Sequence, residues 1–222
     1  MRSKTEWCVF FMCVLFVAGN VQAQDIRANL YGAYVFDDKI DSYYSSSTYY
    51  EGKIKGGLQW GGGIEYMVRP LYGVELLYLR QDTKAPTVYV RDLSSSIEET
   101  NFDIALNYIM LGGARHLLSS NGKLEGFGGL MAGMVIAELK NPDNGREANA
   151  TKFSWGVRLG GIAWASESVG IKVQAQLLSA VQSMGGGLYF GTGGAGAGVS
   201  SYSTIYQFSL GGGLVFKFPI EK

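Results

Sequence analysis

The sequence near the C-terminal end reads Tyr206-Gln207-Phe208-Ser209-Leu210-Gly211-Gly212-Gly213-Leu214-Val215-Phe216-Lys217-Phe218. Its even positions are aromatic, aliphatic or glycine, and its odd positions are mostly polar or small. A period of two predicts a β-strand whose two faces meet different environments. A shift of one residue would turn Lys217 toward the apolar side, at a cost of about 2–4 kcal/mol in the middle of a bilayer. The pattern therefore predicts a strand with one face toward lipid and one toward a polar interior.

Seven earlier stretches have the same character, which gives eight predicted strands. They cover 26–36, 58–66, 72–81, 101–110, 123–139, 153–160, 169–177 and 206–218. In the fourth stretch, Phe102 to Met110 form the apolar set and are expected to face lipid, opposite Asp103. The third has leucines on both faces beside Glu75, and the fifth is apolar on both faces after Glu125, so its sides stay unassigned.

The connections between these stretches alternate in length. Short ones fall at 69–72, 119–122 and 166–168, and long ones at 37–55, 82–99, 140–151 and 182–202. Tight turns on one side and long loops on the other are typical of barrels that cross a membrane. We expect an all-β fold, an eight-stranded antiparallel up-and-down transmembrane β-barrel, with the N-terminus and the short turns on the periplasmic side.

The first residues fit a secretory signal peptide. Arg2 and Lys4 precede an apolar stretch from Cys8 to Ala18, and Val21-Gln22-Ala23 resembles a cleavage site. We therefore expect residues 1–23 to be removed and residues 24–222 to form a single barrel domain. Both cysteines lie in the leader, so the remaining chain has none for a disulfide or a metal site. Its near-neutral charge gives no electrostatic reason to expect nucleic acid as a partner.

Two sets of residues are predicted from the strand faces. Buried charges must be paired, so charged residues on the inner faces are expected to form a network that fills the lumen. This network comprises Arg27, Glu65, Glu75, Asp103, Arg158, Lys172 and Lys217. Aromatic residues at both strand ends are expected to form two girdles at the membrane interfaces. The girdles comprise Phe36, Trp60, Tyr66, Tyr72, Phe102, Phe153, Trp155, Tyr206, Phe216 and Phe218.

With these features the chain resembles the small eight-stranded outer-membrane barrels of the OmpA, OmpX and OmpW type, within the porin-like group of outer-membrane β-barrel domains. The resemblance covers the whole chain after the leader, and its strongest carriers are 202–218 and 60–66. It implies integration into the outer membrane of a Gram-negative bacterium. One departure concerns the C-terminus, because Phe218 is followed by four residues where such barrels commonly end on an aromatic residue.

No residue is assigned a catalytic, cofactor-binding or metal-binding role. Outer-membrane enzymes of this size resemble lipid A-modifying enzymes. Such an enzyme would need its catalytic histidine near the long loops. The single histidine after the leader, His116, lies by a short turn and is interpreted as an interfacial or turn residue. Gly191 to Gly196 match G-x-G-x-x-G, but outside a βαβ unit this spacing does not indicate dinucleotide binding.

The sequence favours the first of three functions, which is not an enzyme, and the other two are alternatives. The first is a non-enzymatic barrel with a plugged lumen that displays four long loops, of which the Ser/Tyr-rich stretch 42–50 could contact a surface ligand. The second is a narrow conduit or binding site for small or lipophilic solutes, as the resemblance to OmpW implies. The third is a lipid A-modifying enzyme. Expected partners are outer-membrane lipid, lipopolysaccharide, the outer-membrane assembly machinery and periplasmic chaperones.

Overall fold

The computed structural model describes residues 25–40, 50–89, 98–142, 145, 147–181, 187–191, 194–198 and 205–220. The predicted signal peptide lies outside these residues. The described secondary structure consists of strands. They are β1 (Asp25–Val35), β2 (Asp38–Ile40), β3 (Tyr50–Ile54), β4 (Gly57–Arg69), β5 (Tyr72–Tyr89), β6 (Glu98–Leu118), β7 (Leu124–Lys140), β8 (Glu147–Trp164), β9 (Val169–Val181), β10 (Gly187–Gly191), β11 (Gly194–Gly198) and β12 (Ile205–Pro219). Within the described part of the chain, no helix has the length and apolar character to cross a bilayer.

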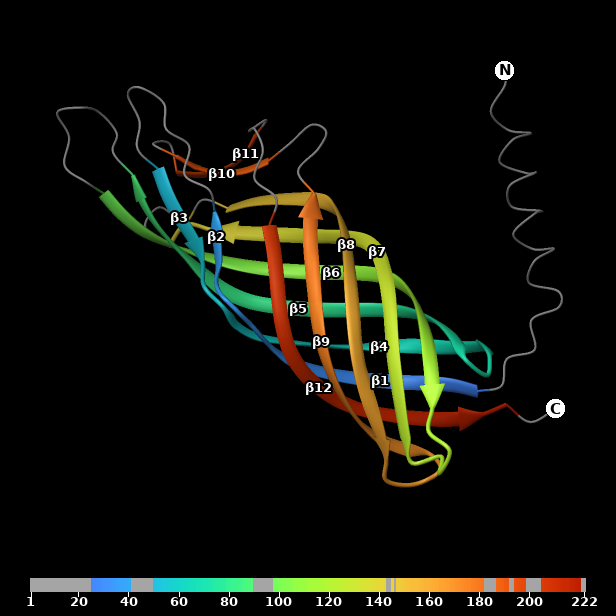
Figure 1. Cartoon of the computed structure of the whole chain (residues 1–222). Helices are drawn as coiled ribbons and strands as arrows, with labels where there is room; N and C mark the ends of the chain where they lie inside the picture. Colours follow the sequence, from blue (N-terminus) through green and yellow to red (C-terminus); the bar gives the residue numbers. More distant parts are fainter. Residues whose placement is uncertain are drawn as a thin grey trace, which may run out of the picture.

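Eight of these strands close into an antiparallel barrel (Figure 1). The ring runs β1, β4, β5, β6, β7, β8, β9 and β12, and each strand pairs with the next along the chain. Pairing between β1 and β12, from Asp25 opposite Pro219 to Val35 opposite Ser209, closes the ring. The predicted fold class is confirmed. The short strands β2 and β3 continue outward from β5, and β10 and β11 form a separate hairpin.

One end of the barrel, called here the turn end, carries the three short connections. They occupy 70–71, 119–123 and 165–168, as predicted. In the second of them, Gly122 has a φ of 69°, a left-handed conformation that favours glycine. The side chain of Asn121 accepts a hydrogen bond from the Lys123 amide at 3.0 Å. These tight connections fix the order of neighbouring strands around the ring.

The opposite end, called the loop end, differs from the prediction. β5 continues to Tyr89 and β6 begins at Glu98, while β7 continues to Lys140 and β8 begins at Glu147. Much of the sequence predicted as the second and third long loops is therefore strand. As a result β5 to β8 are 17 to 21 residues long, whereas β1, β4, β9 and β12 have 11 to 15.

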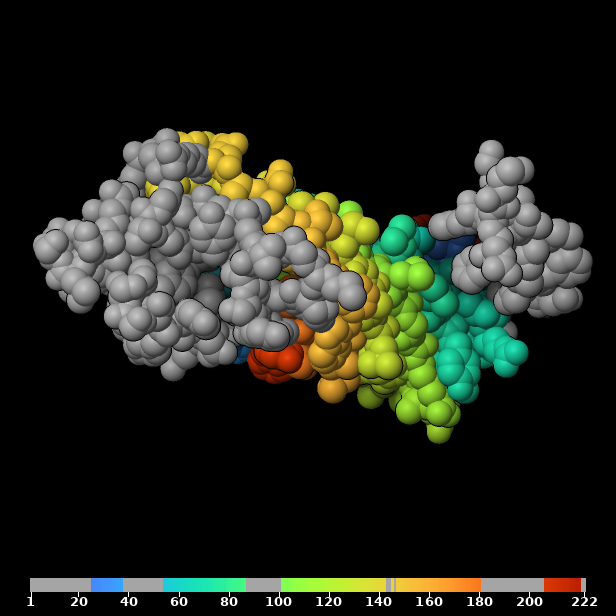
Figure 2. Space-filling model, turned by 90° about the horizontal axis from the view of Figure 1, so that it is seen from above, coloured from blue at the N-terminus to red at the C-terminus, as the bar shows by residue number. Residues whose placement is uncertain are grey.

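The outer surface of the barrel has an apolar belt. Exposed large side chains occur on all eight strands, among them Leu30, Ile64, Leu76, Leu111, Leu130, Leu159, Val173 and Leu210. Outward charges among the described residues lie at the ends, such as Arg115 at the turn end and Lys84 at the loop end. In Figure 2 the outward side chains of neighbouring strands form a continuous surface along the wall. An exposed apolar surface of this extent marks a membrane contact rather than a surface in water.

The face prediction for the fourth stretch, now β6, is wrong. Phe102, Ile104, Leu106, Tyr108 and Met110 face inward and are buried, so Phe102 belongs to no outer girdle. The prediction took the part of β6 nearest the loop end as the lipid-crossing part. There the outward residues are polar because they lie beyond the apolar belt, and the inward ones pack together. The lipid-facing part is further along, at Ile109, Leu111 and Leu117, which are exposed.

The structure shows which side of β7 faces the lumen, which the sequence left open. Phe127, Met131, Val135 and Leu139 are buried in the lumen, whereas Leu130 and Met134 are exposed outside. Its inward residues pack with those of β5 and β6 into a core cluster. The inward face of β7 therefore contributes apolar side chains to the interior of the barrel.

Candidate functional site: a charged network in the lumen

The lumen has two parts of different chemistry. The part near the turn end, called the turn half, holds charged side chains that are almost fully buried. They are Asp25, Arg27, Glu65, Glu75, His116, Glu125, Arg158 and Lys172. The part near the loop end, called the loop half, holds an apolar cluster together with neutral glutamines and serines. The turn half is the candidate site, because buried charges are costly and need specific partners.

Glu65 on β4 and Glu75 on β5 are direct cross-strand partners in the turn half. Two like charges directly opposite each other destabilise a sheet unless other groups separate them. Glycines make room for them to diverge. A Cβ added at Gly63 would lie 2.3 Å from Glu75 Oε1, and one at Gly73 would lie 2.7 Å from Glu65 Oε1. Each carboxylate therefore occupies space that a larger residue on the neighbouring strand would take.

Glu75 is held by groups from β1 and β8. It forms a buried ion pair with Arg158 and accepts hydrogen bonds from Asn29 Nδ2 at 2.8 Å and from Tyr31 Oη at 2.7 Å. Lys172 on β9 donates to Asn29 Oδ1 at 3.0 Å and to Tyr31 Oη at 3.2 Å. Its Nζ also lies 4.8 Å from the centroid of the Phe127 ring. This part of the network joins four strands across the middle of the lumen.

Glu65 belongs to a second part of the network, nearer the turn end. His116 on β6 places Nε2 3.0 Å from Glu65 Oε1 and Nδ1 2.6 Å from Glu125 Oε1. Arg27 forms an ion pair with Glu125 and a longer one with Asp25, at 3.3 Å. The Trp164 indole donates to Glu125 Oε2 at 3.0 Å. The two parts together bring side chains from β1, β4, β5, β6, β7, β8 and β9 into the turn half.

The structure places the predicted network residues unequally. Arg27, Glu65, Glu75, Arg158 and Lys172 lie together in the turn half. Lys217 lies at the rim, where its side chain is 37% exposed and its Nζ is 3.5 Å from Asp25 Oδ2.

Asp103 corrects the prediction. It is on the outer face, its side chain is 52% exposed, and it pairs with Lys84 at 3.8 Å. The physical reason is the reversed face of β6 described above.

His116 is a second correction. It is 2% exposed and lies inside the lumen, stacked on Phe127 with ring centroids 6.0 Å apart. It is therefore neither an interfacial nor a turn residue. Sequence reasoning also missed Glu125 and Asp25 as members of the network. One signal was present: His116 shares its parity with Phe102 to Met110, so a correct face for β6 would have placed it inside.

The loop half has a different lining. Apolar side chains from β5, β6, β7 and β9 form one part of it, including Leu79, Leu106, Val135 and Leu178. Neutral amides form another part. Gln207 donates to Gln81 at 2.8 Å and accepts from Tyr108 Oη at 2.7 Å, and Gln176 donates to Gln59 at 3.4 Å. The loop half therefore carries little charge, in contrast to the turn half.

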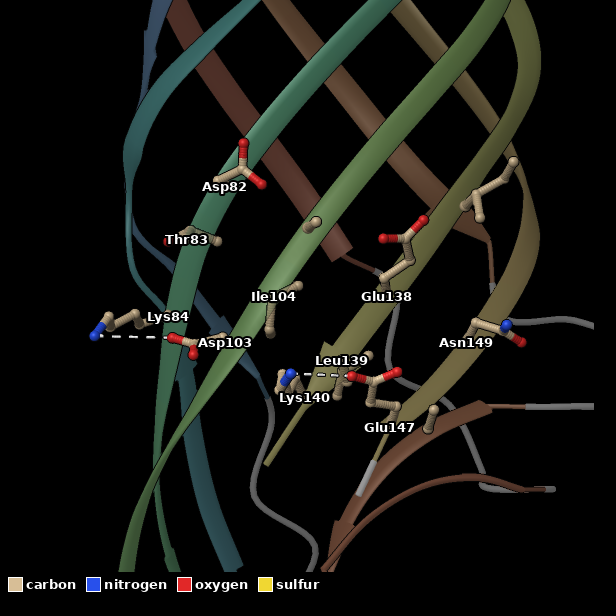
Figure 3. A pocket seen from close by; sticks show the side chains of 13 residues that line it. Asp82, Thr83, Lys84, Asp103, Ile104, Glu138, Leu139, Lys140, Glu147 and Asn149 are labelled. Carbon is tan, nitrogen blue, oxygen red and sulfur yellow. Dashed lines mark ion pairs between the residues drawn. The ribbon is translucent and has the colours of Figure 1, made fainter. Parts of the chain in front are cut away.

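Outside the barrel, a hollow of about 850 Å³ lies over β5 to β8 at the loop end (Figure 3). A row of alternating charges crosses these strands, in the order Lys84, Asp103, Lys140 and Glu147, each opposite the next. Two ion pairs are formed within the row, Lys84–Asp103 at 3.8 Å and Lys140–Glu147 at 3.1 Å (dashed in Figure 3). This hollow is lined by the charged row together with apolar side chains such as Ile136 and Leu139.

The geometry defines a class, a closed eight-stranded β-barrel with an apolar outer belt and a network of buried charges in its lumen. No protein-family model matches the sequence, and no curated protein does. Solved structures match the fold over most of the chain. They include Neisserial surface protein A, with a TM-score of 0.56 and 12% identity over 87% of this chain and 97% of that one.

Two other similar structures are outer-membrane proteins. The outer membrane protease OmpT from Escherichia coli has a TM-score of 0.55 and 9% identity, covering 90% of this chain and 99% of that one. The outer membrane protein OprG from Pseudomonas aeruginosa has a TM-score of 0.53 and 12% identity, covering 90% and 98%. The fold of this chain is therefore that of the small outer-membrane β-barrels.

Proposed function

We propose that the chain is a non-enzymatic, integral outer-membrane barrel that holds its loop-end surface rigidly at the cell surface and does not conduct through its lumen. The observation that carries this proposal is the buried network of the turn half. Glu75–Arg158 and the series Glu65–His116–Glu125–Arg27 cross the lumen with side chains that are at most 6% exposed. Ions or solutes could pass only if these buried pairs separated, which would leave uncompensated charges.

Conductance of planar bilayers tests the closed lumen. The purified chain at neutral pH should give silent bilayers. A double variant, Glu75→Ala with Arg158→Ala, removes both members of the central pair and should give conductance steps. Lys84→Ala, on the outer face, is the matched control and should stay silent. Steps from the unaltered chain that resemble those of the double variant would overturn the proposal.

The orientation and the partners follow from the same surfaces. With the turn end in the periplasm, the apolar belt contacts outer-membrane lipid, and the hollow over β5 to β8 meets the headgroup region of lipopolysaccharide. The two ends of the belt carry exposed aromatic residues that suit this interface, for example Trp60 and Phe153 at one end and Tyr72 and Phe218 at the other. Insertion would need periplasmic chaperones and the assembly machinery, and the loop-end surface is the place for a surface ligand.

A second candidate is a binding site for small lipophilic molecules in the loop half. The apolar inner side chains of β5 and β7, such as Leu79 and Val135, favour it. Mass spectrometry of lipophilic molecules that copurify with the chain is the test. A defined molecule that is lost in Leu106→Asn would support this candidate, and a chain that carries none would remove it.

Enzymatic activity is tested separately, because one similar structure is a protease. The absence of activity is supported by the position of His116, which is buried in the turn half among carboxylates and away from the loop end. Cells that overproduce the chain should leave added peptides intact and the mass spectrum of their lipid A unchanged. Either a cleaved peptide or a shifted lipid A mass would contradict the proposal.

A further inference from the structure

His116 has an unusual pair of neighbours. Both ring nitrogens lie within hydrogen-bond distance of a carboxylate oxygen, Nδ1 at 2.6 Å from Glu125 and Nε2 at 3.0 Å from Glu65. An ionised carboxylate only accepts hydrogen bonds, and a neutral imidazole has just one N–H to donate. While both carboxylates are ionised, the two contacts can both be hydrogen bonds only when the ring carries two protons. The geometry therefore fits an imidazolium cation.

The charges around the ring agree with this state. Four buried carboxylates face the turn half, Asp25 from β1, Glu65 from β4, Glu75 from β5 and Glu125 from β7. The other buried basic side chains among the described residues are Arg27 from β1, Arg158 from β8 and Lys172 from β9. Lys217 from β12 is at the hydrated rim, beside Asp25. A protonated His116 gives the buried set equal numbers of positive and negative charges.

The ring also has a route for proton exchange. A cavity of about 440 Å³ opens at the turn end and is lined by His116, Glu125, Asp25, Trp164 and Lys217, among others. Water in this cavity can take up a proton from the ring or return it. In the proposed orientation this water belongs to the periplasm.

We propose that His116 is a protonated lock of the turn half: its imidazolium joins Glu65 on β4 to Glu125 on β7, and loss of one ring proton as the pH rises releases the lock. Deprotonation transfers one N–H proton to water and leaves a nitrogen lone pair facing a carboxylate oxygen. One of the two hydrogen bonds is then replaced by repulsion. The stabilisation is present while the ring is protonated and is lost on the alkaline side. This inference deepens the proposed function, since it names what controls the closed turn half.

Nuclear magnetic resonance of the ring nitrogens tests the protonation directly. The sequence has one histidine, so ¹⁵N-histidine labelling gives a single site when the chain is purified without a polyhistidine tag. Both ring nitrogens should give imidazolium signals at neutral pH and convert to a neutral ring at alkaline pH. A neutral tautomer at neutral pH would overturn the proposal.

The heat stability of the folded barrel, followed by its shift on a gel, tests the lock. The unfolding midpoint of the unaltered chain should fall by several degrees across the pH range in which the ring loses its proton. In the double variant Glu65→Gln with Glu125→Gln, an amide can donate to the neutral ring, and this fall should disappear. Lys84→Ala should keep it, because that side chain is outside. A midpoint that stays constant while the ring deprotonates would refute the lock.

The two proposals fail in different ways. If the lock is absent, the pH dependence is missing while bilayers remain silent at neutral pH. If the lumen is open, conductance steps appear at neutral pH whether or not the ring is protonated.

Discussion

Gly63 and Gly73 show how single residues make the charged lumen possible. Each lies diagonally from a glutamate on the paired strand, and its missing side chain provides the space for that carboxylate. Glycine normally weakens a strand. Here the cost is offset because Glu65 and Glu75 can turn toward different cations.

Substitution of Gly63 by alanine should therefore destabilise the barrel. The added Cβ would meet Glu75 Oε1 at 2.3 Å, and overpacking of this kind costs about 1–3 kcal/mol. Gly32→Ala on β1 is the matched control, because its Cβ would have no atom within 4 Å. Urea unfolding in lipid vesicles measures the free energy of unfolding of both variants. Equal losses of stability would contradict the role of Gly63 in making space for the Glu75 carboxylate.

Arg158 should be sensitive to substitution, because it forms a buried ion pair with Glu75. Arg158→Ala leaves Glu75 buried without its ion pair, which costs about 3–5 kcal/mol. Combining Arg158→Met with Glu75→Gln should restore much of the loss, since no unpaired charge remains. The exposed pair of Lys84 and Asp103 gives the comparison, and Lys84→Ala should cost at most about 1 kcal/mol. If Arg158→Ala lowers the free energy of unfolding no more than Lys84→Ala does, this would argue against a buried ion pair.

At the scale of the strand, the sequence predicted the inner and outer faces correctly only where the strand lies within the membrane. Nearly the whole length of β12 faces lipid on its outer side. The predicted alternation of outward and inward side chains from Tyr206 to Phe218 therefore agrees with the structure. β6 has 21 residues, and only part of it faces lipid. Near the loop end its polar residues point outward into water and its apolar residues inward. An isolated sequence gives the same alternation in both regions, so the height of the membrane along β6 could not be derived from it.

Two substitutions on β6 test this assignment. Asp103→Asn should change the free energy of unfolding by no more than about 0.5 kcal/mol, because the side chain is on the surface. Leu111→Arg should cost about 2–4 kcal/mol if Leu111, which is 59% exposed on the outer face, lies near the middle of the bilayer. The same unfolding experiment measures both. A large loss of stability in Asp103→Asn would indicate that Asp103 lies in the lumen after all.

At the scale of the whole molecule, the closed ring could be predicted because the alternation of short and long connections constrains every strand at once. The lumen network could be predicted only in part. Arg27 and Glu65 were found because they follow the clear alternation of β1 and β4. His116 was missed because it lies beyond the predicted stretch 101–110, whose inner and outer faces were reversed. Glu125 was missed because the sides of 123–139 stayed unassigned.

Closure of the ring should give the chain a heat-dependent mobility on gels. In outer membranes from cells that produce it with its own leader, the unboiled chain should migrate as a compact species and the boiled chain at its full mass. The β1–β12 pairing is the reason, since a closed barrel has no free edge from which unfolding can begin. Recovery as a soluble periplasmic protein without a shift would contradict membrane insertion.

The pairs of the turn half also affect how the barrel forms. Lys172 meets Asn29 across 143 positions of sequence, and Arg27 meets Glu125 across 98. A partly inserted chain therefore exposes these charges without their partners until late strands reach early ones. Contacts so distant in sequence slow folding. They also penalise every incomplete intermediate, so the arrival of β12 beside β1 should be cooperative, and half-assembled barrels should be rare at equilibrium.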